Sequence, residues 1–424
     1  MAATNLIHEF PDEATWENLL GRNEWKDLLN PLHIDLRKLI LHCGDLSDAT
    51  YDAFIGDEDS KYHGSSRYGM KSFFKKVFLP DCASKYQVVA FLYTTPVDVP
   101  PTERGFSVGS KQFYHTNWMG YIAVSTDEET KTNGGRREVY VVWRGTGQMS
   151  ELMKAFNVNL VSALPLMTPQ PVNLIRGSDA NLDGGAKVME GWLNIYTSNN
   201  PRSDFVKVSA QTQVLTKIKE LMEQYKDENI SLIFTGHSLG GVLAALSAYN
   251  VVDTGAVPSH VQVAAFVFNC PMLGNTKLCD NIKGWQNLRI LHVKNEKDLI
   301  LGYHKIICPL YDYAHPGIVF AVDTFKSPYL KFSMNPLDLP SLAVLLHSLP
   351  ALLHVGAGWN GNDKEFQLNF VQRSLALVNK YSGFLKDENG IPKSWFVQEN
   401  KRMVLVENGD WVEKPPFQEE VEHF

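Results

Sequence analysis

Apolar residues recur along the chain in short runs separated by stretches with a helical pattern. The runs that predict strands comprise residues 86–93, 119–125, 138–143, 230–235, 261–268 and 288–293. Helices are expected between them, at 213–222, where apolar residues are spaced three and four apart, and at 242–248. Strands that alternate with helices build a mostly parallel sheet covered on both faces. The pattern therefore predicts an α/β fold.

The first 85 residues follow a different pattern. Apolar residues recur at helical spacing around Trp16 and Trp25 and again from Leu36 to Ile40. We therefore expect an N-terminal helical region over residues 1–85, packed on an α/β domain over residues 86–424, the two forming one structural unit. Residues 127–135 are rich in turn-forming types and predict a hairpin loop between two strands.

Composition narrows the class of protein. The chain has 424 residues, of which 44% are hydrophobic, and a formal net charge of −7. A negative balance argues against nucleic acid as a partner, because phosphate binding needs a basic face. Five scattered cysteines form no metal-like pair, and they predict buried, reduced thiols in a reducing compartment.

Two segments bear on targeting and membranes. The N-terminus has neither a basic start followed by an apolar core nor an arginine- and serine-rich composition, so we expect no signal or transit peptide. The most apolar stretch, residues 337–353, is interrupted by charged residues, histidine and proline, and it is too interrupted for a membrane span. Together with the cysteines, this predicts a cytoplasmic protein.

The chemistry of the chain centres on Gly236-His237-Ser238-Leu239-Gly240, which follows an apolar strand and opens an apolar helix. This strand–turn–helix context turns a serine into an exposed nucleophile. The segment from Gly105 to Gly109 matches the same short pattern, but prolines and polar residues surround it. We interpret that second match as a loop without chemistry.

A serine nucleophile needs a base, and the base needs an orienting carboxylate further along the chain. Asp298 lies just after a predicted strand, whereas Asp312 and Asp323 have less obvious strands before them. His347 and His354 share one apolar stretch, and spacing alone does not separate them as the base. The remaining C-terminal histidines are His304, His315 and His423.

The developing oxyanion needs two N–H donors. We expect one from Leu239, directly after the nucleophile, and one from Thr146, in the loop that follows the central strand 138–143. This chemistry requires no metal and no cofactor.

Taken together, these motifs resemble the class 3 lipase family of α/β-hydrolases, and in particular the plant cytosolic, class II phospholipase A1 group. The resemblance covers nearly the whole chain. The segments that carry it include 16–21, 51–54, 60–62, 117–124, 141–146, 191–198, the serine turn, 327–331, 354–361 and 373–380.

The resemblance implies an α/β-hydrolase fold and cleavage of acyl esters of glycerolipids. It assigns the nucleophile to Ser238, the acid to Asp298 and the oxyanion donors to Thr146 and Leu239. The family's catalytic histidine opens a segment that here runs from His347 to His354, so the resemblance assigns the base to His347. It implies a lipid or other acyl-ester substrate. Any contact with a membrane surface is expected to be transient.

The chain departs from the family pattern close to these residues. Leu152 follows Glu151 where relatives have tryptophan, Cys270-Pro271-Met272 replaces a Ser-Pro-Arg sequence, and Ser348 and Pro350 replace a polar pair beside the base. We expect these differences to affect which substrate is bound more than the acyl-enzyme chemistry.

Two other functions use the same features. The acyl-enzyme could pass its acyl group to an alcohol, as in an acyltransferase, or the triad could serve a carboxylesterase that acts on a specialised metabolite. A binding protein on a hydrolase fold is the third hypothesis, and the complete Ser, Asp and His set argues against it. The pattern makes no prediction of oligomeric state.

Overall fold

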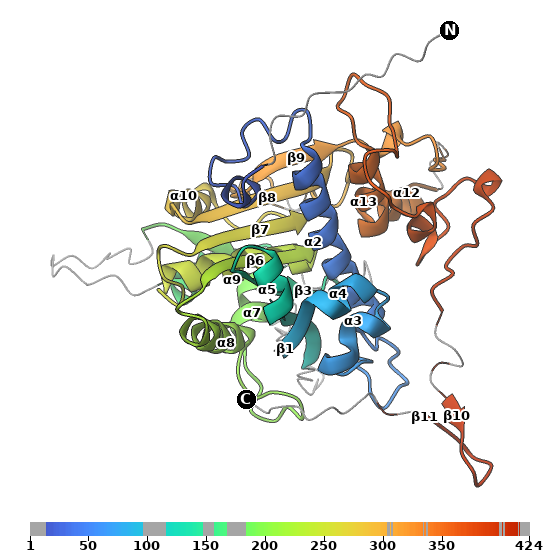
Figure 1. The fold of residues 1–424 in the computed structure, drawn as a ribbon, viewed down its shortest axis with the longest axis horizontal. Helices are drawn as coiled ribbons and strands as arrows, with labels where there is room; N and C mark the ends of the chain where they lie inside the picture. The colour runs from blue at the N-terminus through green and yellow to red at the C-terminus, as the bar shows by residue number, and fades with distance from the viewer. Residues whose placement is uncertain are drawn as a thin grey trace, which may run out of the picture.

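The computed structural model describes residues 14–95, 116–146, 157–167, 184–302, 306, 308–333, 335, 338–397, 401, 403–413 and 415. Within these residues a seven-stranded sheet runs through the middle of the molecule, in the order β1-β2-β3-β6-β7-β8-β9 (Figure 1). Its strands are β1 (Tyr86–Thr94), β2 (Asn117–Ser125), β3 (Arg136–Trp143), β6 (Asn229–His237), β7 (Gln262–Phe268), β8 (Leu288–Asn295) and β9 (Ile318–Val322).

The sheet is mostly parallel, as predicted. β2 pairs antiparallel with β1 and with β3, and from β3 through β9 all neighbouring strands are parallel. Six of the seven strands match the predicted runs. The seventh, β9, lies at the edge of the sheet and is buried at only two of its five positions, so it lacks the apolar run that marks a central strand.

Helices cover both faces of the sheet, and each face has its own hydrophobic core. The first face is covered by α7 (Glu190–Thr197), α8 (Ala210–Gln224), α9 (Leu239–Asp253) and α10 (Thr276–Gly284). The second face is covered by α2 (Ile34–Ala53), α3 (Phe73–Lys76), α4 (Pro80–Lys85) and α13 (Leu349–Gly358). This three-layer arrangement has helices on both faces of a mostly parallel sheet, as the predicted α/β-hydrolase fold requires.

The remaining elements are short. They are α1 (Trp16–Leu19), η1 (Met70–Ser72), α5 (Asp127–Thr132), β4 (Leu160–Ser162), η2 (Leu164–Leu166), β5 (Lys187–Met189), η3 (Thr324–Lys326), α12 (Leu339–His347), η5 (Leu375–Asn379), η6 (Asp387–Asn389), β10 (Met403–Leu405) and β11 (Trp411–Glu413). The described part of residues 1–85 thus carries helices, as expected, and α2 packs against β6 in the middle of the sheet.

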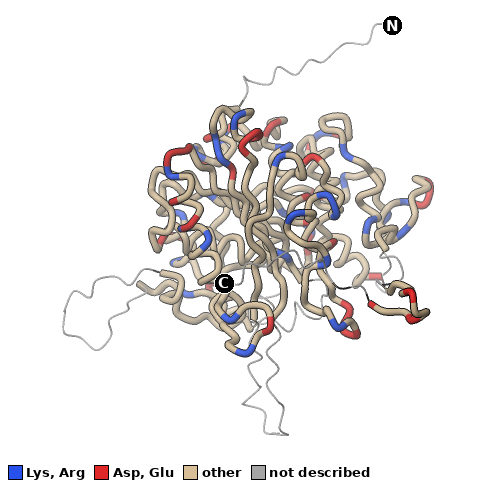
Figure 2. Tube along the Cα trace, turned by 60° about the horizontal axis from the view of Figure 1, so that its bottom comes forward, with Lys and Arg blue, Asp and Glu red and all other residues tan. Residues whose placement is uncertain are grey.

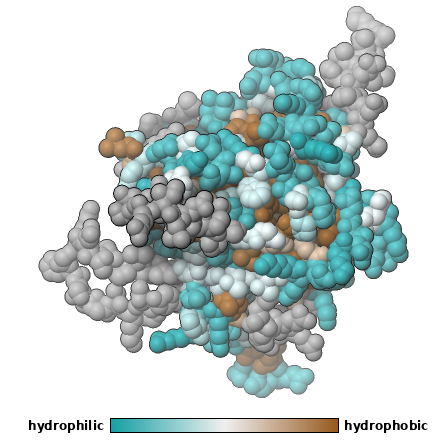
Figure 3. Space-filling model, turned by 90° about the vertical axis from the view of Figure 1, so that its left-hand side faces the viewer, coloured by the Kyte–Doolittle hydropathy of each residue, from teal (hydrophilic) through white to brown (hydrophobic). Residues whose placement is uncertain are grey.

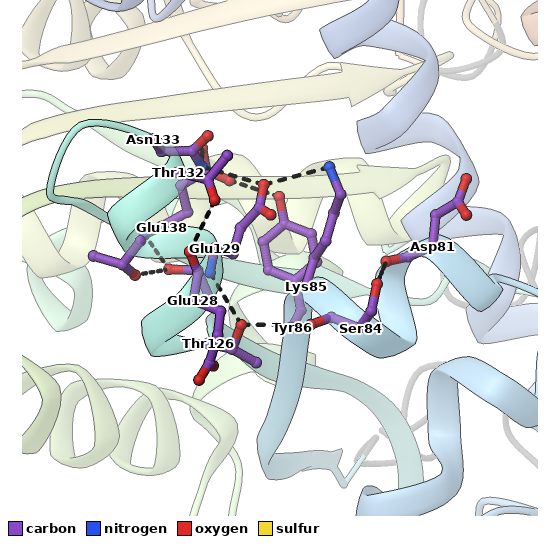
Figure 4. A network of polar contacts seen from close by, with 12 residues as sticks. Asp81, Ser84, Lys85, Tyr86, Thr126, Glu128, Glu129, Thr132, Asn133 and Glu138 are labelled. Carbon is purple, nitrogen blue, oxygen red and sulfur yellow. Dashed lines mark hydrogen bonds and ion pairs between the residues drawn. The ribbon is translucent and has the colours of Figure 1, made fainter.

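The stretch predicted as a hairpin loop does join the antiparallel strands β2 and β3, but it contains a helix. Thr126 accepts a hydrogen bond from the N–H of Glu129 and so caps the N-terminus of α5, whose first turn is acidic. Glu129 also pairs with Lys85, and Asn133 donates to Glu138, which ties the helix to the end of α4 and to β3 (Figure 4). A threonine three residues before a glutamate is a helix-start signal, and the turn-forming residues around it masked it.

Two apolar stretches also take definite form. The apolar residues 160–167 form β4 and the single turn η2. The apolar stretch that ends at residue 353 contains α12 and the first half of α13, and the two helices meet at a bend of 61°. Among the described residues, no single helix is long and apolar enough to cross a membrane, and only this bent pair reaches the required length and composition.

Charged residues lie mostly on the outside of the fold, and most of the cysteines lie inside it. Lysine, arginine, aspartate and glutamate are interspersed around the outside, while the sheet in the middle is free of them over most of its area (Figure 2). All five cysteines are unpaired, and four of them are buried. Burial raises the pKa of Cys43 and Cys270 well above the usual thiol range, so both thiols are protonated at neutral pH.

The C-terminal segment is fastened to α2 by a buried ion cluster. Lys380 donates to Asp48 at 2.6 Å and to Asp52 at 2.7 Å, and Arg373 pairs with Asp45 at 2.9 Å. Burial raises the pKa of Asp52 to about 6, although the ammonium of Lys380 acts in the opposite direction. The cluster holds α2 against residues 373–380, which contain η5.

Replacing Lys380 by methionine should destabilise the fold, because it leaves two carboxylates without their buried partner. We expect the free energy of unfolding to fall by about 3–5 kcal/mol, the usual cost of breaking a buried pair from one side. Urea titration measures this change. The control is Lys331→Met, which removes an exposed partner of Asp387 and should leave the unfolding midpoint nearly unchanged.

Candidate active site

The serine turn connects β6 to α9 at the centre of the sheet. Ser238 has φ 56° and ψ −122°, a backbone conformation that a residue with a side chain rarely adopts. Its N–H donates to the carbonyl of Phe268 at the end of β7, at 2.9 Å, which fastens the turn to the neighbouring strand. The strained conformation aims the hydroxyl away from the sheet, as a nucleophile requires.

Two glycines make this turn possible. A Cβ at Gly236 would lie 2.2 Å from the carbonyl oxygen of Gly240, and a Cβ at Gly240 would lie 2.4 Å from the carbonyl oxygen of Trp143. Any side chain at either position would therefore force strand and helix apart. The same close approach brings the end of β3, and the loop that follows it, against the first turn of α9.

Three predicted residues meet at this turn. His347, the last residue of α12, places Nε2 2.9 Å from Oγ of Ser238 and Nδ1 2.7 Å from Oδ2 of Asp298. All three side chains are buried. A carboxylate only accepts, so Nδ1 of neutral His347 carries the proton, and Nε2 is free to accept the serine proton.

The carboxylate is held in place by the loop that follows β8. Asp298 accepts the N–H of Ile300 on Oδ1 at 2.9 Å, which leaves Oδ2 for the imidazole. The two rival aspartates serve other purposes. Asp312 accepts hydrogen bonds from the N–H and hydroxyl of Thr276 at the start of α10, and Asp323 caps η3.

The other histidines have different partners. His354 lies inside α13, where its Nε2 shares a hydrogen bond of 2.7 Å with the hydroxyl of Ser327. Burial lowers the pKa of His354 to about 4. His315 is half-buried beside His292, with ring centroids 4.1 Å apart. The remaining two candidates, His304 and His423, lie outside the described residues, as does the second serine motif at 105–109.

The predicted oxyanion donors lie on the two segments that approach each other. Leu239 is the first residue of α9, where the N–H groups have no carbonyl partner one turn earlier and the helix dipole is positive. Thr146 follows β3 and is half-buried. Because Gly240 lies against Trp143 and Arg144, the loop from β3 runs next to the first turn of α9.

Sequence reasoning missed a buried polar group behind the triad. His237 precedes the serine, and its ring touches Tyr51 on one side and the main chain of His347 on the other. Burial, and to a lesser degree the charge of His347, lowers the pKa of His237 to about 3, so its ring is neutral. Its position beside the nucleophile was the available signal, but its partners come from α2 and α12, distant in the sequence.

The chain was compared with known proteins. The family model Lipase (class 3) matches residues 140–304. Phospholipase A1-IIdelta of Arabidopsis thaliana is 45% identical over 97% of this chain and 98% of its own length. Phospholipase A1-II 5 of Oryza sativa subsp. japonica is 40% identical over 95% of this chain and 83% of its own.

Among solved structures, a triacylglycerol lipase from Penicillium expansum aligns with a TM-score of 0.40 and 16% identity, over 69% of this chain and 80% of that one. The sequence matches extend over almost the full length of the described fold, including the serine turn and the segment that carries His347. The chain therefore belongs to the class 3 lipase family and, within it, to the group of plant phospholipase A1-II proteins.

Proposed function

We propose that this protein hydrolyses acyl esters of glycerolipids, and that its preferred bond is the sn-1 ester of a phospholipid. The observation that carries the proposal is the hydrogen-bonded series Asp298–His347–Ser238 on a strained strand-to-helix turn. The relatives at 40% and 45% identity, which are named phospholipase A1, support the substrate class.

The geometry suits acyl transfer to serine. His347 takes the proton of Ser238 on Nε2 while Oγ attacks the ester carbonyl, and Asp298 stabilises the imidazolium that forms. The N–H groups of Leu239 and Thr146 are the proposed donors to the oxyanion. The imidazolium then returns its proton to the leaving alcohol, which departs as a lysophospholipid.

Deacylation repeats the steps with water. His347 removes a proton from the water, the hydroxide attacks the acyl-enzyme carbonyl, and Ser238 recovers its proton as the fatty acid leaves. The burial of all three side chains supports this scheme, because hydrogen bonds and charges act more strongly where bulk water is excluded.

Exposed apolar side chains on the segments that carry Asp298 and His347 support a lipid substrate. Leu299 directly follows Asp298 and is 50% exposed, and Leu339 and Val344 are exposed on the helix that carries His347. Apolar patches interrupt the mostly polar face that Figure 3 shows. We propose that Leu299, Leu339 and Val344 contact acyl chains and touch a membrane surface transiently.

We also propose that the protein works in the cytoplasm. The five unpaired cysteines support a reducing compartment, where thiols persist.

Replacing Ser238 by alanine should lower kcat for p-nitrophenyl esters by about 10⁴–10⁶-fold, because the nucleophile and its base act as a unit. Stopped assays and fluorophosphonate labelling measure the loss. The matched control is Ser107→Ala in the second serine motif, which should keep full activity and labelling. Unchanged turnover in Ser238→Ala would contradict the proposal, and failure of the wild-type protein to label would favour the binding-protein hypothesis.

The two candidate bases can be separated by paired variants. His347→Ala should lower kcat by about 10⁴-fold or more, because Ser238 then lacks its proton acceptor. His354→Ala should keep kcat within a few-fold, since its ring bonds Ser327, and should lower the melting temperature. Activity and thermal melts are recorded on both. Our assignment of the base is wrong if only His354→Ala is inactive.

Product analysis tests the proposed bond and acceptor. With a phosphatidylcholine that carries different acyl chains at its two positions, we expect free acid from sn-1 and the matching 2-acyl lysophospholipid, measured by mass spectrometry. Release from sn-2 would contradict the proposed preference. Ester formation in the presence of an added alcohol, with little free acid, would support the acyltransferase hypothesis instead.

A further inference from the structure

The base His347 stands at an abrupt helix end. The chain leaves α12 at Ser348, which has φ −64° and ψ 127° and already caps α13. Carbonyl groups in the last turn of a helix have no N–H one turn further on, and in a buried helix end they need other donors. Leu345 uses the N–H of Ser348, at 3.1 Å. The carbonyls of Leu346 and His347 are bound by side chains from the ends of the sheet strands.

Two asparagines bind the carbonyl of Leu346. Asn295, the last residue of β8, donates from Nδ2 at 2.8 Å, and Asn269, directly after β7, donates from Nδ2 at 3.3 Å. Both side chains are fully buried. Oδ1 of Asn269 accepts the main-chain N–H of Asn295 at 2.8 Å, which fixes the orientation of its amide. Both lone pairs of the carbonyl are therefore occupied.

Asn269 also fits its backbone. Its φ is 39°, in the left-handed region that asparagine and glycine tolerate better than other residues. Its N–H donates to Val293 at 2.9 Å, so the residue is anchored to β8 through its main chain as well. Glycine would also adopt this conformation. Of the two residue types, asparagine alone also supplies a donor to the carbonyl of Leu346.

His237 binds the next carbonyl, that of His347 itself, from Nε2 at 2.8 Å. A carbonyl oxygen only accepts, so Nε2 carries the proton and Nδ1 of the neutral ring is an acceptor. The hydroxyl of Tyr51, on α2, therefore donates to Nδ1, at 2.7 Å. The Tyr51 oxygen in turn accepts the N–H of Gly145 in the proposed oxyanion loop.

We propose that His237, Asn269 and Asn295 form a clamp on the last turn of α12 that positions His347 for catalysis, with Tyr51 fixing the tautomer of His237. This inference rests on the proposed function. His347 must stay within hydrogen-bond distance of Ser238 and Asp298 at once, and both distances depend on where its main chain lies. The first three residues of α12 are exposed and its last three are buried, so the helix is held in place at its last turn.

Variants of His237 give the first test. His237→Leu keeps the bulk and removes the donor, whereas His237→Gln places an amide N–H near the position of Nε2. We expect the leucine variant to lower kcat per fluorophosphonate-titrated serine by about 10–100-fold with KM changed less than about 2-fold, as a misplaced catalytic group does. The glutamine variant should recover kcat to within about 5-fold of the wild-type value.

A matched pair of asparagines gives the second test. This test remains available if the His237→Leu variant fails to fold. Asn379 is buried and, like Asn269, donates to one carbonyl and accepts one main-chain N–H, but it lies in η5. Asn269→Asp and Asn379→Asp should lower the melting temperature similarly. Only Asn269→Asp should lower kcat, by about 10-fold, because its carboxylate repels the carbonyl that it must hold.

The outcomes separate this inference from the proposed function. Wild-type kcat in His237→Leu and Asn269→Asp, per titrated serine, would overturn the clamp while Ser238→Ala stays inactive. Equal losses of kcat in Asn269→Asp and Asn379→Asp, or in the leucine and glutamine variants of His237, would also overturn the clamp. They would show that these residues stabilise the fold without positioning His347. Full activity of Ser238→Ala would instead remove the proposed function on which the clamp rests.

Discussion

The structure depends on the close approach of two main chains where β6 turns into α9. Gly236 and Gly240 bring strand and helix into backbone contact, and Gly240 brings both against the end of β3. Ser238 is thereby held in a strained conformation that its hydrogen bond to Phe268 maintains. This one packing constraint positions Ser238, the first turn of α9 and the loop from β3. The helix α9 that follows is buried on all sides.

The proposed base, His347, reaches the same point by a different route. His347 comes from a helix end more than one hundred residues further along the chain, and its orientation depends on satisfying buried carbonyls rather than on strain. In the proposed clamp, side chains at the carboxyl ends of β6, β7 and β8 supply those donors. Because buried polar groups must be paired, the side chains at the carboxyl ends of these strands hold the last turn of α12 and so support His347. Tyr51 extends this support to α2 and to Gly145, so the base and the proposed oxyanion loop share one network.

Much of the architecture could be predicted from local patterns. Central strands such as β3 and β6 are continuous apolar runs, since both faces are covered, and the serine turn carries its own glycines. Edge strand β9 and the helix α5 escaped prediction for opposite reasons. β9 has too few buried positions to show a pattern, whereas the cap of α5, Thr126, lies among residues that also favour turns.

The sequence by itself determined the strand–turn–helix unit around Ser238, because glycine placement and apolar runs act over a few residues. It also limited the acid and base to a few residues, but spacing left His347 and His354 equal, and only the resemblance to a family favoured the first. The tertiary structure decided which histidine faces the serine: α12 and α13 bend apart between them, so His347 meets Ser238 while His354 is buried against Ser327. It also decided the roles of His237, Asn269 and Asn295. Their partners are brought together only by the packing of the sheet against α2 and α12, and no local pattern encodes a contact between residues so far apart in the chain.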